Sequence, residues 1–100
     1  MTVSVRFILY LESSLELSAG KTVIPVELEE GSTFVGFLKR LEGYFGPALA
    51  KEIYDPRKRS LHELVKATLN GVLVHNLPDG LDSILHQGDA VIFFPLVMGG

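Results

Sequence analysis

The residues with the clearest chemical potential are the last five, Leu96-Val97-Met98-Gly99-Gly100. Pro95 ends the apolar run before them, because proline cannot donate a backbone hydrogen bond to a neighbouring strand. The four residues from Val97 onward reach at most ~14 Å. Glycine has no Cβ and accepts backbone angles closed to other residues, so a Gly-Gly terminus fits a narrow channel. We therefore expect residues 97–100 to form a flexible arm that presents the Gly100 carboxylate to another protein.

Other polar clusters are weaker candidates. The three histidines have no Cys or carboxylate at metal-ligand spacing, so we expect no metal site. Ser60, His62 and Glu63 are residue types of a hydrolase site, but no nucleophile elbow accompanies them. The basic run at 57–59 is too short for a nucleic-acid site and fits a solvated turn better than a docking spot for an acidic partner. We expect no catalytic side chain and no enzymatic activity.

Composition and charge narrow the class of protein. The chain has 100 residues, of which 47% are hydrophobic and 21% charged, and this predicts one globular domain over 1–100. With no cysteine, any sulfur that the chain carries must come from elsewhere. The net charge of −3 argues against nucleic acid as the main partner. No apolar run is long enough to span a membrane and no secretory signal is evident, so we expect a cytoplasmic protein without membrane partners.

The first elements expected to support the arm are two strands. Alternating apolar residues from Val3 to Leu9 predict a strand over 2–11. The β-branched segment Thr22 to Leu28 predicts a second strand, so that 2–28 forms a hairpin with a loose turn. Pro25 is typical of an edge strand.

A helix is predicted over 33–45, with Ser32 or Thr33 as its N-cap. Its apolar face is expected to pack on the first strand. The two sets are Phe34, Leu38, Leu41 and Phe45 on the helix and Val3, Val5, Phe7 and Leu9 on the strand. A short helix over 48–54 and a charged turn over 55–60 are predicted to follow.

The rest of the sequence predicts further strands and turns. Segments 66–69 and 72–74 flank Asn70-Gly71, a dipeptide typical of a tight hairpin. Residues 77–87 predict a turn or a single helical turn, and 90–95 the last strand. This order predicts an α+β protein with a ubiquitin-like β-grasp fold, a mixed sheet wrapped around one main helix, although ferredoxin-like folds share similar orders.

The last strand is apolar on both of its faces. Val91 and Phe93 point to one side and Ile92 and Phe94 to the other, whereas a single helix covers only one side of a sheet. One pair should therefore lie on an open surface and mark a partner site, unless the segment 47–65 folds back over it. The predicted partner interface consists of Ile92, Phe94, Pro95 and Val97.

The C-terminal third combines several short motifs. They are Asn70-Gly71, Leu77, Gly80-Leu81, Leu85, Gly88-Asp89, Val91, Phe93-Phe94-Pro95, Val97 and Gly99-Gly100. In these motifs the sequence resembles the ThiS/MoaD sulfur-carrier family, and most of all the small subunit of molybdopterin synthase. Its most specific part is the Phe-Phe-Pro followed by a terminal Gly-Gly.

The resemblance implies a function. In this family a ubiquitin-activating-type adenylyltransferase uses ATP to adenylate the terminal glycine, here Gly100, which is then converted to a thiocarboxylate. The sulfur passes to a pterin precursor of the molybdenum or tungsten cofactor, inside the large subunit of molybdopterin synthase. Met98 and Gly99 would thread the partner's channel, although Met98 replaces the small residue usual there. The carrier itself would bind no cofactor.

Two other classes of function remain open. The same activated Gly100 would serve a ubiquitin-like modifier that is passed to lysine amines, or a sulfur carrier for a thiazole, a transfer-RNA base or an amino acid. A plain interaction module with an inert terminus is the third possibility.

Overall fold

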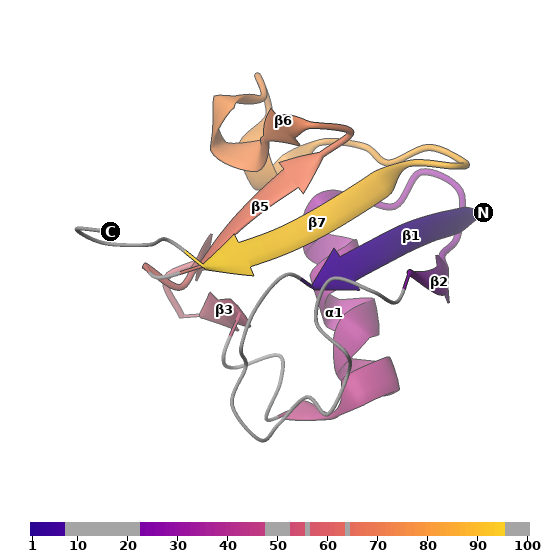
Figure 1. Cartoon of the computed structure of the whole chain (residues 1–100), viewed down its shortest axis with the longest axis horizontal. Coiled ribbons are helices and arrows are strands. Elements are labelled where there is room, and N and C mark those ends of the chain that lie inside the picture. Colours follow the sequence, from indigo (N-terminus) through magenta and orange to yellow (C-terminus); the bar gives the residue numbers. More distant parts are fainter. Residues whose placement is uncertain (8–22, 48–52, 56, 64, 96–100) are drawn as a thin grey trace.

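The computed structural model describes residues 1–7, 23–47, 53–55, 57–63 and 65–95. In chain order, its elements are β1 (Thr2–Phe7), β2 (Ile24–Glu27), α1 (Phe34–Phe45), β3 (Tyr54–Asp55), β4 (Ser60–Leu61), β5 (Val65–Leu69), β6 (Val72–Leu73), the 3-10 turns η2 (Val74–Asn76) and η3 (Gly80–Asp82), and β7 (Ala90–Pro95). Figure 1 shows their arrangement.

Strand β7 lies at the centre of a mixed five-stranded sheet with the order β2-β1-β7-β5-β6. It runs parallel to β1, with Val5 opposite Val91, and antiparallel to β5, with Ala67 opposite Phe93. β1 and β2 form the predicted antiparallel pair, and β2 lies at the sheet edge as its proline predicts. This is the α+β arrangement expected from the sequence.

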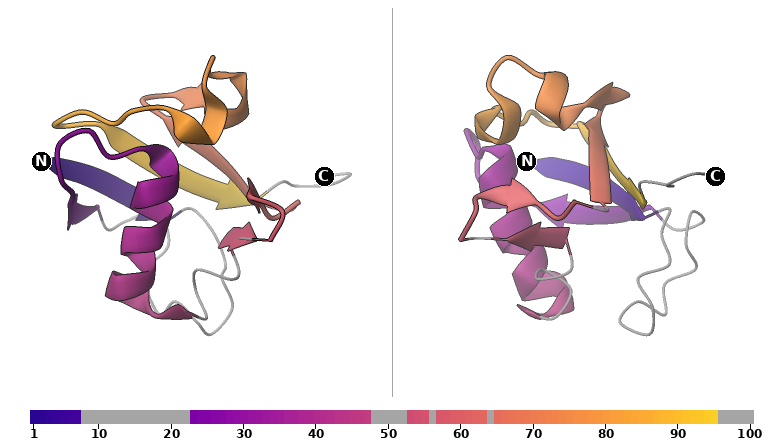
Figure 2. Two further views of the ribbon diagram at one scale, coloured as in Figure 1. Left: turned by 180° about the vertical axis from the view of Figure 1, so that it is seen from behind. Right: turned by 90° about the vertical axis from the view of Figure 1, so that its left-hand side faces the viewer.

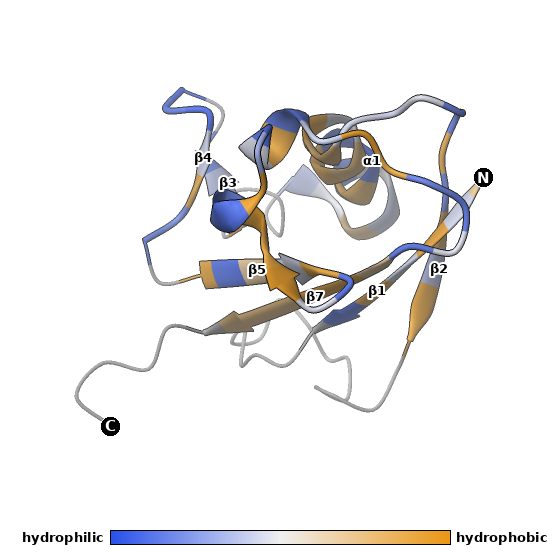
Figure 3. Ribbon diagram, turned by 90° about the horizontal axis from the view of Figure 1, so that it is seen from above, coloured by the Kyte–Doolittle hydropathy of each residue, from blue (hydrophilic) through white to orange (hydrophobic). Residues whose placement is uncertain are grey.

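Helix α1 forms a second layer on one side of the sheet (Figures 2 and 3). Thr33 is its N-cap, and the Thr33 side chain accepts a hydrogen bond from the Gly36 N–H at 3.2 Å. At the other end Gly46 has a φ of 91° and donates its N–H to the Glu42 carbonyl. The predicted helix is confirmed within one residue at its start.

The core lies between these two layers. Helix residues Phe34, Phe37, Leu38 and Leu41 are buried, whereas the predicted core residue Phe45 is only half-buried. On β1, Val3 and Val5 are fully buried as predicted. Leu9 and the Phe7 side chain lie outside the described part of the chain.

The Asn70-Gly71 turn ties the β5–β6 hairpin to the start of β7. Both residues have positive φ, 52° and 88°, as a tight hairpin turn of this type requires. The Asn70 side chain accepts a hydrogen bond from the Ala90 N–H at 2.9 Å and donates one to the Asp89 carboxylate at 3.0 Å. The turn therefore positions the first residue of the central strand.

Several predicted boundaries are wrong. Val23 and Leu28 of the predicted second strand lie outside β2, and the ends of the predicted charged turn, Asp55 and Ser60, belong to β3 and β4. Tyr54, placed in a helix over 48–54, belongs to strand β3, which pairs with β4 across the charged turn. Val74, placed in a strand over 72–74, instead begins the 3-10 turn η2. In that turn its side chain is 2% exposed, so burial in the core outweighs the preference of valine for a strand. Residues 8–11 of the first predicted strand lie outside the described ranges.

Replacing Leu38 with alanine should destabilise the domain by about 2–5 kcal/mol, because Leu38 is 3% exposed and its loss leaves a cavity under the sheet. Urea unfolding measures this loss. The exposed neighbour Lys39 gives a matched helix control, and Lys39→Ala should change stability by less than about 0.5 kcal/mol. Equal effects of the two substitutions would contradict the packing described above.

Asn70→Gly should cost about 1–3 kcal/mol, because glycine accepts the positive φ but makes neither of the two side-chain hydrogen bonds. Asn70→Ala should cost more, since it adds backbone strain to the same loss. Chemical unfolding curves of the three proteins separate the two contributions. A glycine variant as stable as the wild type would show that the hydrogen bonds contribute nothing.

Candidate functional site at the end of strand β7

The candidate site is the end of β7 from which the C-terminal arm leaves. Pro95 is the last residue of the strand and lies opposite Val65 of β5. The predicted arm residues Val97, Met98, Gly99 and Gly100 lie outside the described part of the chain, and their roles stay predictions. The described structure thus defines where the arm begins.

The two faces of β7 differ as alternation predicts. Val91 and Phe93 are 1% and 0% exposed and point to the helix. Ile92 and Phe94 lie on the outward face. Both are half-buried rather than open, and Phe94 also packs partly against the core cluster. The side assignment is therefore confirmed, but the surface is less exposed than expected.

Basic side chains flank this apolar pair. Arg6 of β1 lies opposite Ile92, and Lys66 of β5 lies opposite Phe94. The sequence analysis did not predict that these cations lie next to Ile92 and Phe94. Sheet order and register determine which residues of β1 and β5 lie opposite β7. The alternation in β1 already indicated that Arg6 points away from the core.

Of the other polar candidates, Ser60, His62 and Glu63 line one cavity beside β5, and Ser60 lies in the two-residue strand β4 rather than on a strand-to-helix elbow. His75 and His86 are exposed on separate turns, and within the described ranges no three metal-ligating side chains gather. The predicted solvated turn at 57–59 is exposed, with the Arg57 N–H bound to the Asp55 carboxylate at 2.9 Å. In the same described part, no helix is long and apolar enough to cross a membrane.

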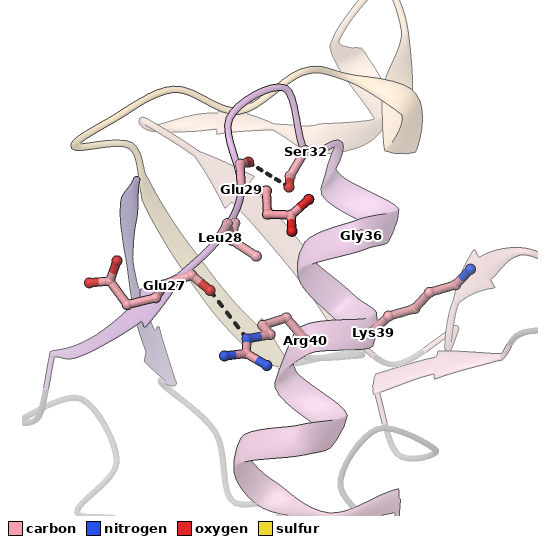
Figure 4. A pocket seen from close by; sticks show the side chains of 7 residues that line it. All are labelled: Glu27, Leu28, Glu29, Ser32, Gly36, Lys39 and Arg40. Atoms are coloured by element: carbon pink, nitrogen blue, oxygen red, sulfur yellow. Dashed lines mark hydrogen bonds between the residues drawn. The ribbon is translucent and has the colours of Figure 1, made fainter.

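One cavity lies away from the end of β7, and another borders it. A polar groove of about 630 Å³ separates the β2 end from α1, and its lining includes Glu27, Glu29, Lys39 and Arg40 (Figure 4). The Arg40 Nε donates to the Glu27 carbonyl at 3.2 Å, so part of this groove is already occupied by its own contacts. A second cavity of about 420 Å³ lies beside β5, and its lining combines apolar residues with Ser60, His62, Glu63, Lys66 and His75.

Within the described ranges, the five-stranded mixed sheet with β7 at its centre and the helix α1 packed on one side define a ubiquitin-like β-grasp domain. The family model described as "ThiS family" matches residues 9–100. The chain therefore belongs to the ThiS family. No curated protein matches it significantly.

Solved structures share the fold over nearly their whole length. The Haloferax volcanii HVO 2177 protein is 28% identical with a TM-score of 0.71, covering 100% of this chain and 87% of its own. SAMP1 from Haloferax volcanii is 21% identical with a TM-score of 0.71, covering 100% of both chains. A putative molybdopterin converting factor, subunit 1, from Pyrococcus furiosus is 24% identical with a TM-score of 0.64, covering 97% and 99%.

Phe93→Ala and Phe94→Ala should lower the free energy of unfolding by different amounts, because Phe93 faces the core and Phe94 faces outward. Phe93 is fully buried, so its loss should cost about 3–5 kcal/mol. Phe94 is half-buried, so its loss should cost about half as much or less. Unfolding free energies from urea titration test this ranking. A larger loss for Phe94→Ala would reverse the assignment of the two faces.

Proposed function

We propose that this chain is a sulfur carrier in the biosynthesis of the molybdenum or tungsten cofactor, with the carboxylate of Gly100 as the group that carries sulfur. The observation that supports this most is the ThiS family match, which extends over residues 9–100 and so includes Gly99-Gly100. Members of the family are small carriers or modifiers that work with partner enzymes. In this proposal the chain acts in the cytoplasm and supplies no catalytic side chain.

The proposed chemistry begins with a poor acyl donor, because a carboxylate has no good leaving group. An oxygen of the Gly100 carboxylate attacks the α-phosphate of ATP bound by an adenylyltransferase, and pyrophosphate leaves. The resulting acyl-adenylate is then attacked by a sulfur nucleophile that the partner supplies, and AMP leaves. Where that nucleophile is a persulfide, a thiol of the partner then attacks the S–S bond, forms a disulfide with the donor sulfur, and leaves Gly100 as a thiocarboxylate.

The described residues contribute position and recognition. β7 is held on both sides, so the arm begins at a defined point beyond Pro95. Ile92 and Phe94 face outward beside that point, and with Pro95 and Val97 they form the proposed contact with partners. Met98 and Gly99 would pass through the partner's channel, where a residue without a Cβ next to the terminus keeps the passage narrow.

The proposed sulfur acceptor is a pterin precursor bound by the large subunit of molybdopterin synthase. The Phe93-Phe94-Pro95 ending and the Pyrococcus furiosus molybdopterin converting factor among the similar structures favour this acceptor. The similarity to SAMP1, a small archaeal modifier protein, favours a second candidate, in which activated Gly100 is joined to protein amines.

Deleting Gly100 should abolish activation. The deletion withdraws the carboxylate by ~3.5 Å, and a misplacement of ~1 Å already costs about 100-fold in rate. Gly99→Val should also fail, because a β-branched side chain widens the arm and restricts its backbone. ATP–pyrophosphate exchange with the adenylyltransferase of the source cell measures the rate, and thermal unfolding should be unchanged in both variants.

Intact mass provides the second measurement. Exchange of one carboxylate oxygen for sulfur adds about 16 Da to the wild-type chain, a covalent change set by atomic masses. The modifier alternative instead predicts isopeptide-linked adducts of higher mass in the source cell. Wild-type exchange rates in the protein without Gly100 would refute the role assigned to Gly100 in both candidates. No exchange by the wild type would leave an inert interaction module.

A further inference from the structure

Charge is unevenly distributed on the outward face of the sheet. Among the described residues of its five strands, the register places three ionisable side chains on this face, namely Arg6, Lys66 and Glu27. Glu27 is the acidic one, and its carboxylate already accepts a hydrogen bond from the Thr2 hydroxyl at 2.7 Å. The face thus has a basic part and an acidic part.

The basic part is at the end of β7 where the arm begins. Lys66 lies opposite Phe94 and Arg6 opposite Ile92, so both cations border the outward apolar pair. Glu27 lies opposite Thr2, four residues before Arg6 along β1. At about 3.3 Å per residue this places Glu27 ~13 Å away along the strand, beyond a Debye length at physiological salt.

We propose that the partner surface that receives this face has an apolar patch bordered by carboxylates, and that Lys66 pairs with one of those carboxylates, with the positive charge of Arg6 beside it. The proposal rests on the proposed function, because the partner in question is the adenylyltransferase that activates Gly100. The proposal specifies that the adenylyltransferase surface is negatively charged. It also gives Lys66 a recognition role that the sequence alone did not indicate.

The chemistry of the two cations favours an acidic protein surface over a phosphate backbone. Both are half-buried beside apolar residues, so the hydrocarbon stem of Lys66 can lie along Phe94 while its ammonium group reaches the rim. Charges at the rim of an interface mainly raise the association rate and fix the orientation of docking. A nucleic acid would need many more phosphate contacts than two cations supply, and the chain carries a net charge of −3.

The test is made at Lys66, because Arg6 already makes another interaction within the chain. Lys66→Glu places a carboxylate opposite the expected carboxylates. Lys39→Glu is the matched control, because it changes the net charge by the same amount as Lys66→Glu. Lys39 is exposed on α1, away from the outward face of the sheet. ATP–pyrophosphate exchange is measured at varying carrier concentration and at low and high salt.

The expected result is a rise of about tenfold in the carrier KM for Lys66→Glu at low salt, with kcat unchanged. This rise should shrink to within about twofold at ~1 M salt, where the Debye length is only ~3 Å. Lys39→Glu should keep the wild-type KM. Lys66→Met, which retains the apolar stem without the charge, should give a smaller rise of the same salt dependence.

Three outcomes would overturn the proposal. Equal KM values for Lys66→Glu and Lys39→Glu, with an active wild type, would refute the proposed role of charge on this face. They would not contradict the proposed function. A KM rise that is independent of salt, and equal in Lys66→Met, would show that Lys66 acts by packing alone. No exchange by the wild type would overturn the proposed function and this proposal together. Circular dichroism of each variant confirms that the comparison is made on folded protein.

Discussion

The contact on which the rest of the structure depends is the burial of Phe93 against two phenylalanines of α1. The Phe93 ring stacks on Phe37 at a centroid distance of 6.4 Å and meets Phe34 edge-on at 6.3 Å. All three rings are fully buried. Because successive residues of a strand point to opposite faces, fixing Phe93 inward also fixes its neighbours Ile92 and Phe94 outward. The core and the proposed partner surface are thus determined by one interaction.

The same strand determines where the arm begins. A slip of one residue in register would exchange the inward pair Val91 and Phe93 for Ile92 and Phe94, which are also apolar, so hydrophobicity alone does not fix the register of β7. The register of β7 is specified by its pairing with β1 and β5. It is also specified at the start of the strand, where the Ser4 N–H donates a hydrogen bond to the Asp89 carbonyl at 2.9 Å. Asn70 and Asp89 therefore have structural roles in the described part of the chain.

Local sequence patterns correctly predicted the structural features that depend on interactions between residues close together in the chain. The helix, its Thr33 cap, the edge position of Pro25 and the Asn70-Gly71 turn each follow from periodicity or backbone preference, and the structure confirms them. Features that depend on tertiary contacts were missed or misplaced. The helix predicted over 48–54 is wrong at Tyr54, because the strand β3 forms by pairing with β4 and local periodicity does not show that pairing. The partial burial of Phe94 likewise depends on neighbours distant in the sequence.

The candidate site divides into parts that differ in how strongly packing constrains them. Inward residues such as Val91 and Phe93 must satisfy the core, where a change of even one methylene is felt. Outward positions such as Arg6 and Lys66 are half-buried, so folding tolerates a wider range of side chains there. Charge on the outward face can therefore change while the packing of β7 stays constant. Proteins only 19–28% identical to this chain share its fold, as expected if packing constrains the inward positions most. Under the proposed function, partner choice then depends on the outward face rather than on the core.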